Sequence, residues 1–147
     1  METATVVCTK KITPPIPIFK NMKTVVNTND APPPIGPYSQ AIIAGNLIYV
    51  SGQIPLHPFT NELVTDNITS ATHLVMENIG AILTAAGADF DDIVKTTIFL
   101  KNMADFAEVN EVYGTYFTDQ FPARETVQAA ALPKGVSVEI SVIAAKS

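Results

Sequence analysis

One long stretch of helical periodicity limits the fold more than any other feature of this 147-residue sequence. Behind Asp66 and Asn67, either of which can cap a helix, apolar or small side chains recur at alternating spacings of four and three residues. They are Ile68, Thr72, Val75, Ile79, Ile82 and Ala86. The spacing predicts an α-helix with one buried face, and Gly87 has the position of a helix-ending glycine. Such a helix must pack on a second layer, which the rest of the chain has to supply.

Short apolar runs elsewhere in the chain predict a β-sheet as that second layer. Strands are expected at residues 23–27, 39–44, 47–54, 93–100, 126–131 and 136–144, and a second helix at 105–117. In the order βββ-α-β-α-ββ, these elements predict an α+β or mixed α/β layer fold with helices on one face of a sheet.

The connections between these elements carry turn-forming residues. Gly45 and Asn46 separate two strands and predict a hairpin turn. Residues 29–37 contain four prolines, which remove backbone donors and exclude regular structure. The run Pro133-Lys134-Gly135 joins the last two strands.

Length and composition indicate one domain with an acidic surface. About 150 residues is the usual size of a single domain. A formal net charge of −5 argues against a nucleic-acid-binding protein and against an anionic membrane surface. No apolar stretch approaches the roughly 20 residues of a spanning helix. The single cysteine, Cys8, excludes an intrachain disulfide.

Residues 1–22 are interpreted as a Pro- and Lys-containing tail or leader, and residues 23–147 as the domain. The tail lacks the apolar core of a secretory signal and the arginines of a mitochondrial presequence. The expected location is cytoplasmic, with mitochondrial or plastid import left open by the tail.

The residues alone do not point to one reaction. His57 and His73 have no partner at metal-ligand spacing, and the sequence has no phosphate loop and no serine nucleophile motif. Arg124 is the only arginine; its planar fork suits a carboxylate ligand, although a surface or interface salt bridge is the simpler interpretation. Glu139 alternates onto the polar side of the last strand, where a solvated position is the simplest interpretation.

The strand at residues 47–50 is apolar on both faces. Two helices of this size cannot cover both faces of a sheet, so a partner subunit is expected on the second face.

Six short motifs, taken together, resemble one known family. They are Ile35-Gly36-Pro37-Tyr38-Ser39-Gln40-Ala41, Tyr49-Val50-Ser51-Gly52-Gln53-Ile54-Pro55, Val94-Lys95-Thr96-Thr97-Ile98-Phe99-Leu100, Val109-Asn110-Glu111-Val112-Tyr113, Phe121-Pro122-Ala123-Arg124 and Ala131-Leu132-Pro133-Lys134-Gly135. In order and spacing, over roughly residues 23–146, they resemble the reactive intermediate deaminase family (Rid, also called YjgF), in its RidA branch.

The resemblance implies a chorismate-mutase-like α+β fold, with a mixed sheet, two helices on one face, and a homotrimer around a central barrel. The active sites would lie in clefts between subunits. The implied activity is hydrolysis of 2-imino or 2-enamino acids, such as 2-iminobutanoate and 2-iminopropanoate, to 2-keto acids and ammonia. No metal or organic cofactor is implied.

The resemblance also carries over site residues. It implies that Arg124 holds the substrate carboxylate and that Glu139 orients or activates the water. Glu139 would stay ionised because Arg124 lies next to it. The resemblance also implies that Tyr38 is catalytic and that three further residues bind the substrate: Ser51, Gly52 and Asn110.

Two departures and two alternatives accompany this interpretation. Thr126 stands where many members have a cysteine, which puts thiol-based reactivity in doubt, and Ser141 replaces a second glutamate of the last strand. The alternative functions are an endoribonuclease or translation inhibitor, and a non-enzymatic holdase or ligand-binding protein using the same cleft. The net charge counts against the first, and Glu139 against the second, because carboxylate binding alone does not require it.

Overall fold

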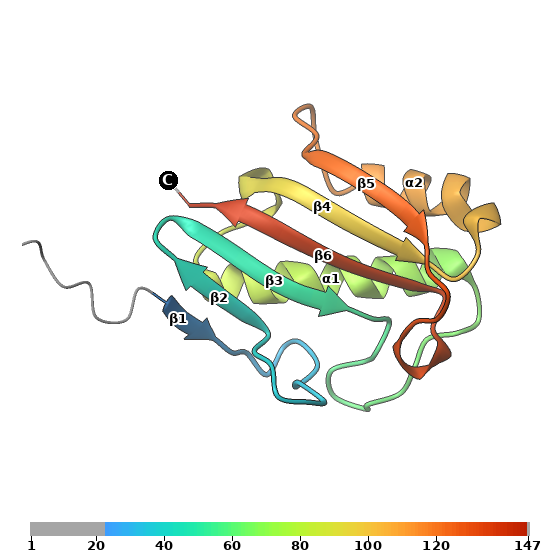
Figure 1. The fold of residues 1–147 in the computed structure, drawn as a ribbon, viewed down its shortest axis with the longest axis horizontal. Helices are drawn as coiled ribbons and strands as arrows, with labels where there is room; N and C mark the ends of the chain where they lie inside the picture. The colour runs from blue at the N-terminus through green and yellow to red at the C-terminus, as the bar shows by residue number, and fades with distance from the viewer. Residues whose placement is uncertain (1–22, 147) are drawn as a thin grey trace, which may run out of the picture.

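The computed structural model describes residues 23–146, so the interpretation of residues 1–22 as a tail lies outside the described part of the chain. Six strands and two α-helices form it (Figure 1). In chain order they are β1 (Lys23–Val26), β2 (Ala41–Ala44), β3 (Leu47–Gln53), α1 (Ile68–Ala86), β4 (Ile93–Leu100), α2 (Phe106–Gly114), β5 (Ala123–Gln128) and β6 (Val138–Ala145). The strands form one sheet in the order β1-β2-β3-β6-β4-β5, in which only β4 and β5 run parallel.

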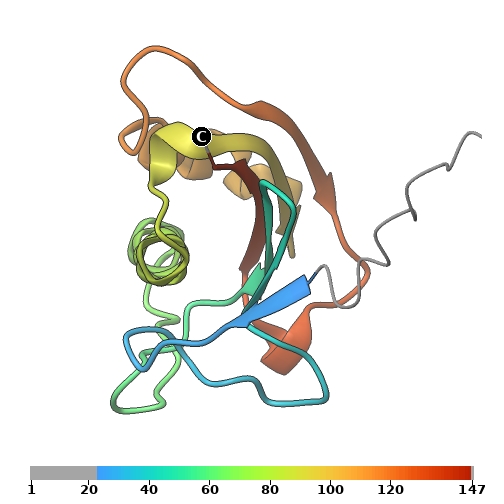
Figure 2. The same ribbon diagram turned by 90° about the vertical axis from the view of Figure 1, so that its left-hand side faces the viewer.

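Both helices lie on the same face of the curved sheet, which confirms the predicted mixed sheet with helices on one face (Figure 2). The predicted periodic face of α1 is buried; Val75, Ile79 and Ile82 have no exposed surface. Asn67 rather than Asp66 caps the helix: its side chain accepts a hydrogen bond from the Ser70 N–H at 2.7 Å.

Gly87 ends α1 in the left-handed region, with a φ of 76°, as its position in the sequence indicates. Ile48, Ile98 and Ile140 of the sheet meet α1 from the opposite side of the core and are fully buried.

The predicted bounds of the fifth strand were wrong by three residues at each end. The expected strand was 126–131, whereas β5 comprises Ala123–Gln128. Its bounds are set by the parallel ladder with β4, in which Lys95 lies opposite Ala123 and Leu100 opposite Gln128. Because β6 pairs with the other side of β4, β5 lies at the sheet edge and not beside β6.

The second helix is also shorter than predicted. It ends at Gly114, and Tyr116 and Phe117 follow in a turn, where they still pack on the core. Phe117 is buried although it lies beyond the helix, whereas Phe106 at the start of α2 is 38% exposed.

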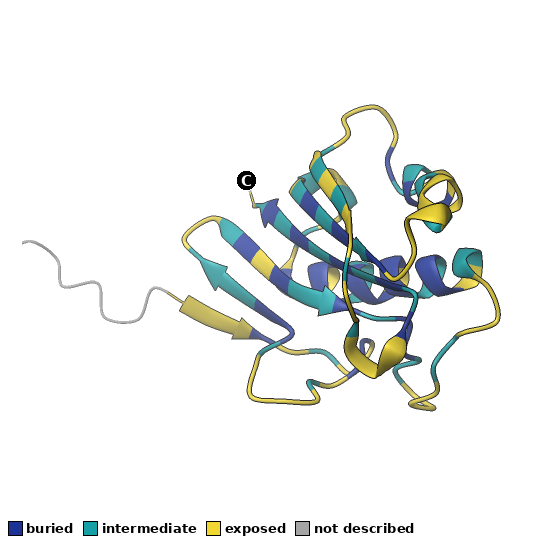
Figure 3. Ribbon diagram, turned by 45° about the vertical axis from the view of Figure 1, so that its right-hand side comes forward, coloured by how far each residue is buried: buried dark blue, intermediate teal, exposed yellow. Residues whose placement is uncertain are grey.

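The other face of the sheet carries no helix. Ile48 and Val50 of β3 point toward the helices, whereas Tyr49 between them is 44% exposed. Figure 3 shows buried and exposed segments alternating along this strand. Val25 and Val127 are also exposed. The predicted apolar residues on both faces of β3 are thus present, and a partner on the open face remains a prediction. Within residues 23–146, no helix is long and apolar enough to cross a membrane.

Candidate active site

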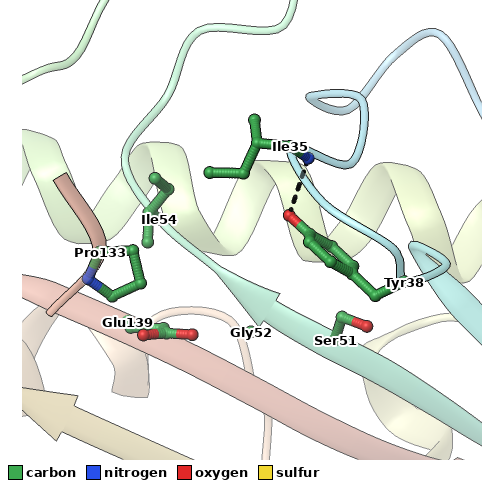
Figure 4. A pocket seen from close by; sticks show the side chains of 7 residues that line it. All are labelled: Ile35, Tyr38, Ser51, Gly52, Ile54, Pro133 and Glu139. Atoms are coloured by element: carbon green, nitrogen blue, oxygen red, sulfur yellow. Dashed lines mark hydrogen bonds between the residues drawn. The ribbon is translucent and has the colours of Figure 1, made fainter.

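A cavity of about 310 Å³ lies where β3 ends and β6 begins, beside the proline loop, residues 29–37. Its lining residues are Ile35, Tyr38, Ser51, Gly52, Ile54, Pro133 and Glu139 (Figure 4). Four of the six predicted site residues meet here, and they come from the loop, from β3 and from β6.

A β-bulge shapes the floor of this cavity. The β3–β6 register shifts between Val50, opposite Val142, and Gln53, opposite Ile140, so Ser51 and Gly52 together occupy the place of one residue. The bulge turns the backbone of Gly52 toward the side chain of Glu139. A Cβ atom at position 52 would lie 2.9 Å from Cδ and 3.0 Å from Cγ of Glu139, so only glycine lets the carboxyl group occupy this place.

The Glu139 side chain is partly removed from water. Burial raises the pKa of its carboxyl group above the ordinary value, because the charged form loses hydration. Among residues 23–146 the one ion pair joins Lys95 and Glu125, so no cation of the described chain offsets that burial. A carboxyl group with a raised pKa in a cavity is a candidate acid or base.

Tyr38 and Ser51 are held by hydrogen bonds that connect the loop to the bulge. The Tyr38 hydroxyl accepts a hydrogen bond from the Ile35 N–H at 3.2 Å. The Ser51 hydroxyl donates to the Ser39 carbonyl at 2.6 Å, and the Ser51 N–H donates to the Gln40 carbonyl at 3.0 Å. With its hydrogen engaged, the Ser51 oxygen can serve a ligand as an acceptor.

Arg124 does not line this cavity. It lies opposite Thr96 in the β4–β5 ladder, and Thr96 is fully buried beneath α2, where it accepts a hydrogen bond from the Tyr113 hydroxyl at 3.0 Å. Glu139 lies opposite Phe99, three residues farther along β4 and therefore on the other face of the sheet. Within one chain the sheet separates Arg124 from Glu139, so their expected proximity would have to arise between subunits and stays a prediction.

The guanidinium group of Arg124 is packed on the aromatic rings of α2. Its Cζ atom lies 5.0 Å from the centre of the Tyr113 ring and 5.7 Å from that of Phe106. This is the geometry of a cation–π contact, which leaves the edges of the guanidinium able to donate hydrogen bonds. The simpler interpretation as a salt bridge finds no partner within residues 23–146.

Asn110 lies on α2 between Phe106 and Tyr113, near this arginine and not near the cavity. Its Oδ1 atom and the Oγ1 atom of Thr126 are buried and have no hydrogen-bond partner within the described residues. The predicted site therefore consists of two groups. We call Tyr38, Ser51, Gly52 and Glu139 the cavity group, and Arg124 and Asn110 the arginine group.

The apolar walls of the cavity were not assigned from the sequence. Ile35, Ile54 and Pro133 supply them. All three lie within the family motifs, and Ile35 and Ile54 lie within three residues of an assigned residue; that position was the available signal. Among the described residues, no group of three His, Cys, Asp or Glu side chains could hold a metal ion.

Comparison with known families decides the relationship. The family described as endoribonuclease L-PSP matches residues 28–146. The chain belongs to this family, which is also the Rid (YjgF) family. A RutC family protein of Pyrococcus horikoshii is 53% identical over 125 residues, covering 85% of this chain and 99% of that protein. A mouse protein named 2-iminobutanoate/2-iminopropanoate deaminase is 47% identical over 123 residues, covering 84% and 91%.

Solved structures of the Rid family share the fold. A Rid family protein of Yersinia pestis has a TM-score of 0.82 and 51% identity, covering 84% of this chain and 98% of that one. TdcF of E. coli, crystallised with bound serine, has a TM-score of 0.81 and 41% identity, covering 84% and 99%. These identities confirm the resemblance of the six motifs to the Rid family.

Proposed function

We propose that this protein hydrolyses 2-imino acids, in equilibrium with 2-enamino acids, to 2-keto acids and ammonia. The carboxyl group of Glu139 on the floor of a cavity with apolar walls is the observation that carries the proposal. The name of the mouse relative supports the reaction, and the serine bound to TdcF supports a small ligand with a carboxylate.

The chemistry asks little beyond positioning and one base. A protonated imine is already electrophilic at C2, so water can add there while Glu139 accepts a proton. Glu139 returns that proton to the nitrogen, and the C–N bond breaks. The hydroxyl proton passes to Glu139 and from there to the departing ammonia, so iminium and water give the keto acid and ammonium. Tyr38 and Ser51 are proposed to orient the water and the nitrogen at the cavity wall.

The arginine group completes this site from a neighbouring subunit. Arg124 is proposed to hold the substrate carboxylate by two parallel hydrogen bonds, with the Asn110 amide beside it. Within one chain the two groups lie on opposite faces of the sheet. A cyclic trimer, in which each cavity group faces the arginine group of the next subunit, brings them together without refolding.

A trapping assay tests the reaction. A threonine dehydratase generates 2-iminobutanoate, and semicarbazide captures the imine that survives. We expect less semicarbazone when this protein is present, in proportion to its concentration. An unchanged yield with trimeric protein would contradict the proposed function.

Mixing two inactive variants tests the shared site. Arg124→Lys and Glu139→Gln are unfolded together and refolded, so that subunits distribute at random. In a trimer with sites between neighbours, each mixed ring has one site with both native residues, and about one quarter of wild-type activity returns. Sites contained within single subunits would give no recovery.

The family description names an endoribonuclease, which makes RNA cleavage the second candidate. The net charge of −5 does not favour it, since phosphate binding needs a cationic surface. Cleavage that persists in repurified trimer and is lost in Arg124→Lys or Glu139→Gln would support it.

A further inference from the structure

Gln40 is a buried amide that the proposed reaction does not use. Its side chain is only 2% exposed, just beyond the proline loop and one residue before β2. Burying an amide without hydrogen-bond partners would lower the stability of the fold, so the partners of Gln40 indicate its role.

The Gln40 side chain binds only backbone atoms at the start of the proline loop. Its Nε2 group donates to the carbonyls of Thr28 at 3.0 Å, Ala31 at 3.1 Å and Pro32 at 2.8 Å. Its Oε1 atom accepts the Thr28 N–H at 2.7 Å. The amide therefore ties residues 28–32 to the far end of the loop, since Gln40 follows Tyr38 by two positions.

The proline content of the loop explains why a side chain has to donate hydrogen bonds to its carbonyls. Residues 29–37 include four prolines, which have no N–H to donate, so the loop cannot satisfy its own carbonyls as an ordinary turn does. Ala31 and Pro32 are buried, where water does not replace the missing donors. The two Nε2 hydrogens of Gln40 supply them.

The backbone of the same residue holds the other side of the cavity. The Gln40 carbonyl accepts the Ser51 N–H at 3.0 Å, directly at the bulge. Gln40 thus connects three parts: the start of the proline loop, the segment that carries Tyr38, and the bulge that carries Ser51 and Gly52.

We propose that Gln40 is a positioning residue, which fixes Tyr38 over the bulge and thereby sets the geometry of the cavity group. This inference rests on the proposed function for its kinetic consequence. The position of Tyr38 can be tested without the reaction. The Ile35 N–H donates a hydrogen bond to the Tyr38 hydroxyl, so the exchange rate of that amide shows whether Tyr38 keeps its place.

The test variant is Gln40→Met, which keeps the length of the side chain and removes its donors. We expect kcat for 2-iminobutanoate to fall by about 10-fold in intact trimer, with a smaller change in KM, since misplaced groups cost rate. In a Tyr38→Phe background the same change should lower kcat no more than about twofold, because residues that act through one another are not additive. An additive loss would overturn the positioning role.

Ile82→Val is the matched control. It removes one buried methylene from α1 and does not line the cavity. We expect it to lower the thermal midpoint while leaving kcat unchanged below that midpoint. If Ile82→Val lowers kcat as much as Gln40→Met does, the effect of Gln40 is general destabilisation and the proposal is overturned.

Amide hydrogen exchange separates this inference from the proposed function. In Gln40→Met the Thr28 and Ile35 amides should exchange at least about 10-fold faster, while α1 amides stay within twofold. Unchanged exchange at both would overturn the proposal whatever the activity. If wild-type protein does not deaminate, the proposed function fails, and the Ile35 exchange rate alone decides whether Gln40 fixes Tyr38.

Discussion

The cavity group and the arginine group are built in different ways, although both serve one proposed site. The cavity group depends on irregular backbone: a bulge at Ser51-Gly52 and a proline loop held by hydrogen bonds. The arginine group stands on regular elements, with Arg124 in the edge strand β5 lying on the rings of α2. The geometry of the cavity group is therefore set by backbone hydrogen bonds and the bulge, whereas the arginine group is held by ring contacts and leaves Asn110 Oδ1 without a hydrogen-bond partner among the described residues.

The largest effect is expected at Glu139. Glu139→Gln keeps the size and hydrogen bonding of the side chain but removes the base, so kcat should fall by about 10²–10⁴-fold. Binding of 2-ketobutyrate, a product mimic, should change little, because the carboxylate contact lies in the arginine group. Steady-state kinetics and calorimetry measure both. A normal turnover would exclude Glu139 as the base.

A somewhat smaller loss is expected at Arg124. Arg124→Lys keeps the charge and removes the planar fork, so the substrate carboxylate loses its second hydrogen bond and deamination should fall by about 10²-fold. In contrast to Glu139→Gln, 2-ketobutyrate should bind much more weakly in calorimetry. Normal binding by an intact trimer would make this arginine a structural residue.

Gly52 tests the bulge with a smaller change. Gly52→Ala places a Cβ atom about where Glu139 now packs, at 2.9 Å from its Cδ atom, so the carboxyl group must move. We expect about 10-fold lower kcat with little change in stability, because the displaced carboxyl group is the end of a flexible side chain.

The control is Gly114→Ala at the end of α2, where a Cβ atom would meet nothing within 4 Å. It should keep activity and stability or gain up to about 1 kcal/mol of helix stability. Equal kinetics for the two variants would show that Glu139 does not depend on the glycine.

Much of the fold could be predicted because local patterns determine it. The α1 stripe, the Gly87 stop and the hairpin at Gly45 are each properties of a few neighbouring residues. The bounds of β5 could not be predicted, because pairing with β4 defines them and apolar residues 129–132 continue the pattern past the ladder.

The motifs name Glu139 and Arg124 as candidates, and their functional roles stay predictions. Their placement on opposite faces could not be read from the motifs, because it depends on the β4 register, which places Thr96 opposite Arg124 and Phe99 opposite Glu139. The bulge could not be predicted either, because two residues of β3, Ser51 and Gly52, oppose one residue of β6 without any periodic pattern in the sequence.

The smallest expected effect concerns the pH profile, and it asks whether the two groups meet. Burial raises the pKa of Glu139 in the single chain, so a base at this position loses activity as the pH falls through that raised value. A neighbour's guanidinium beside it would favour the charged form and bring the pKa down.

Removing that cation in Arg124→Ala should therefore move the acid limb of kcat/KM, which reports the free enzyme, to higher pH. Arg124→Lys, which keeps the charge, should move it less. Lys23→Ala, at the opposite edge of the sheet from β5, removes the same charge and should leave the limb in place. An acid limb unmoved in Arg124→Ala would mean that the guanidinium does not face Glu139 in the assembly, and the shared site would have to be abandoned.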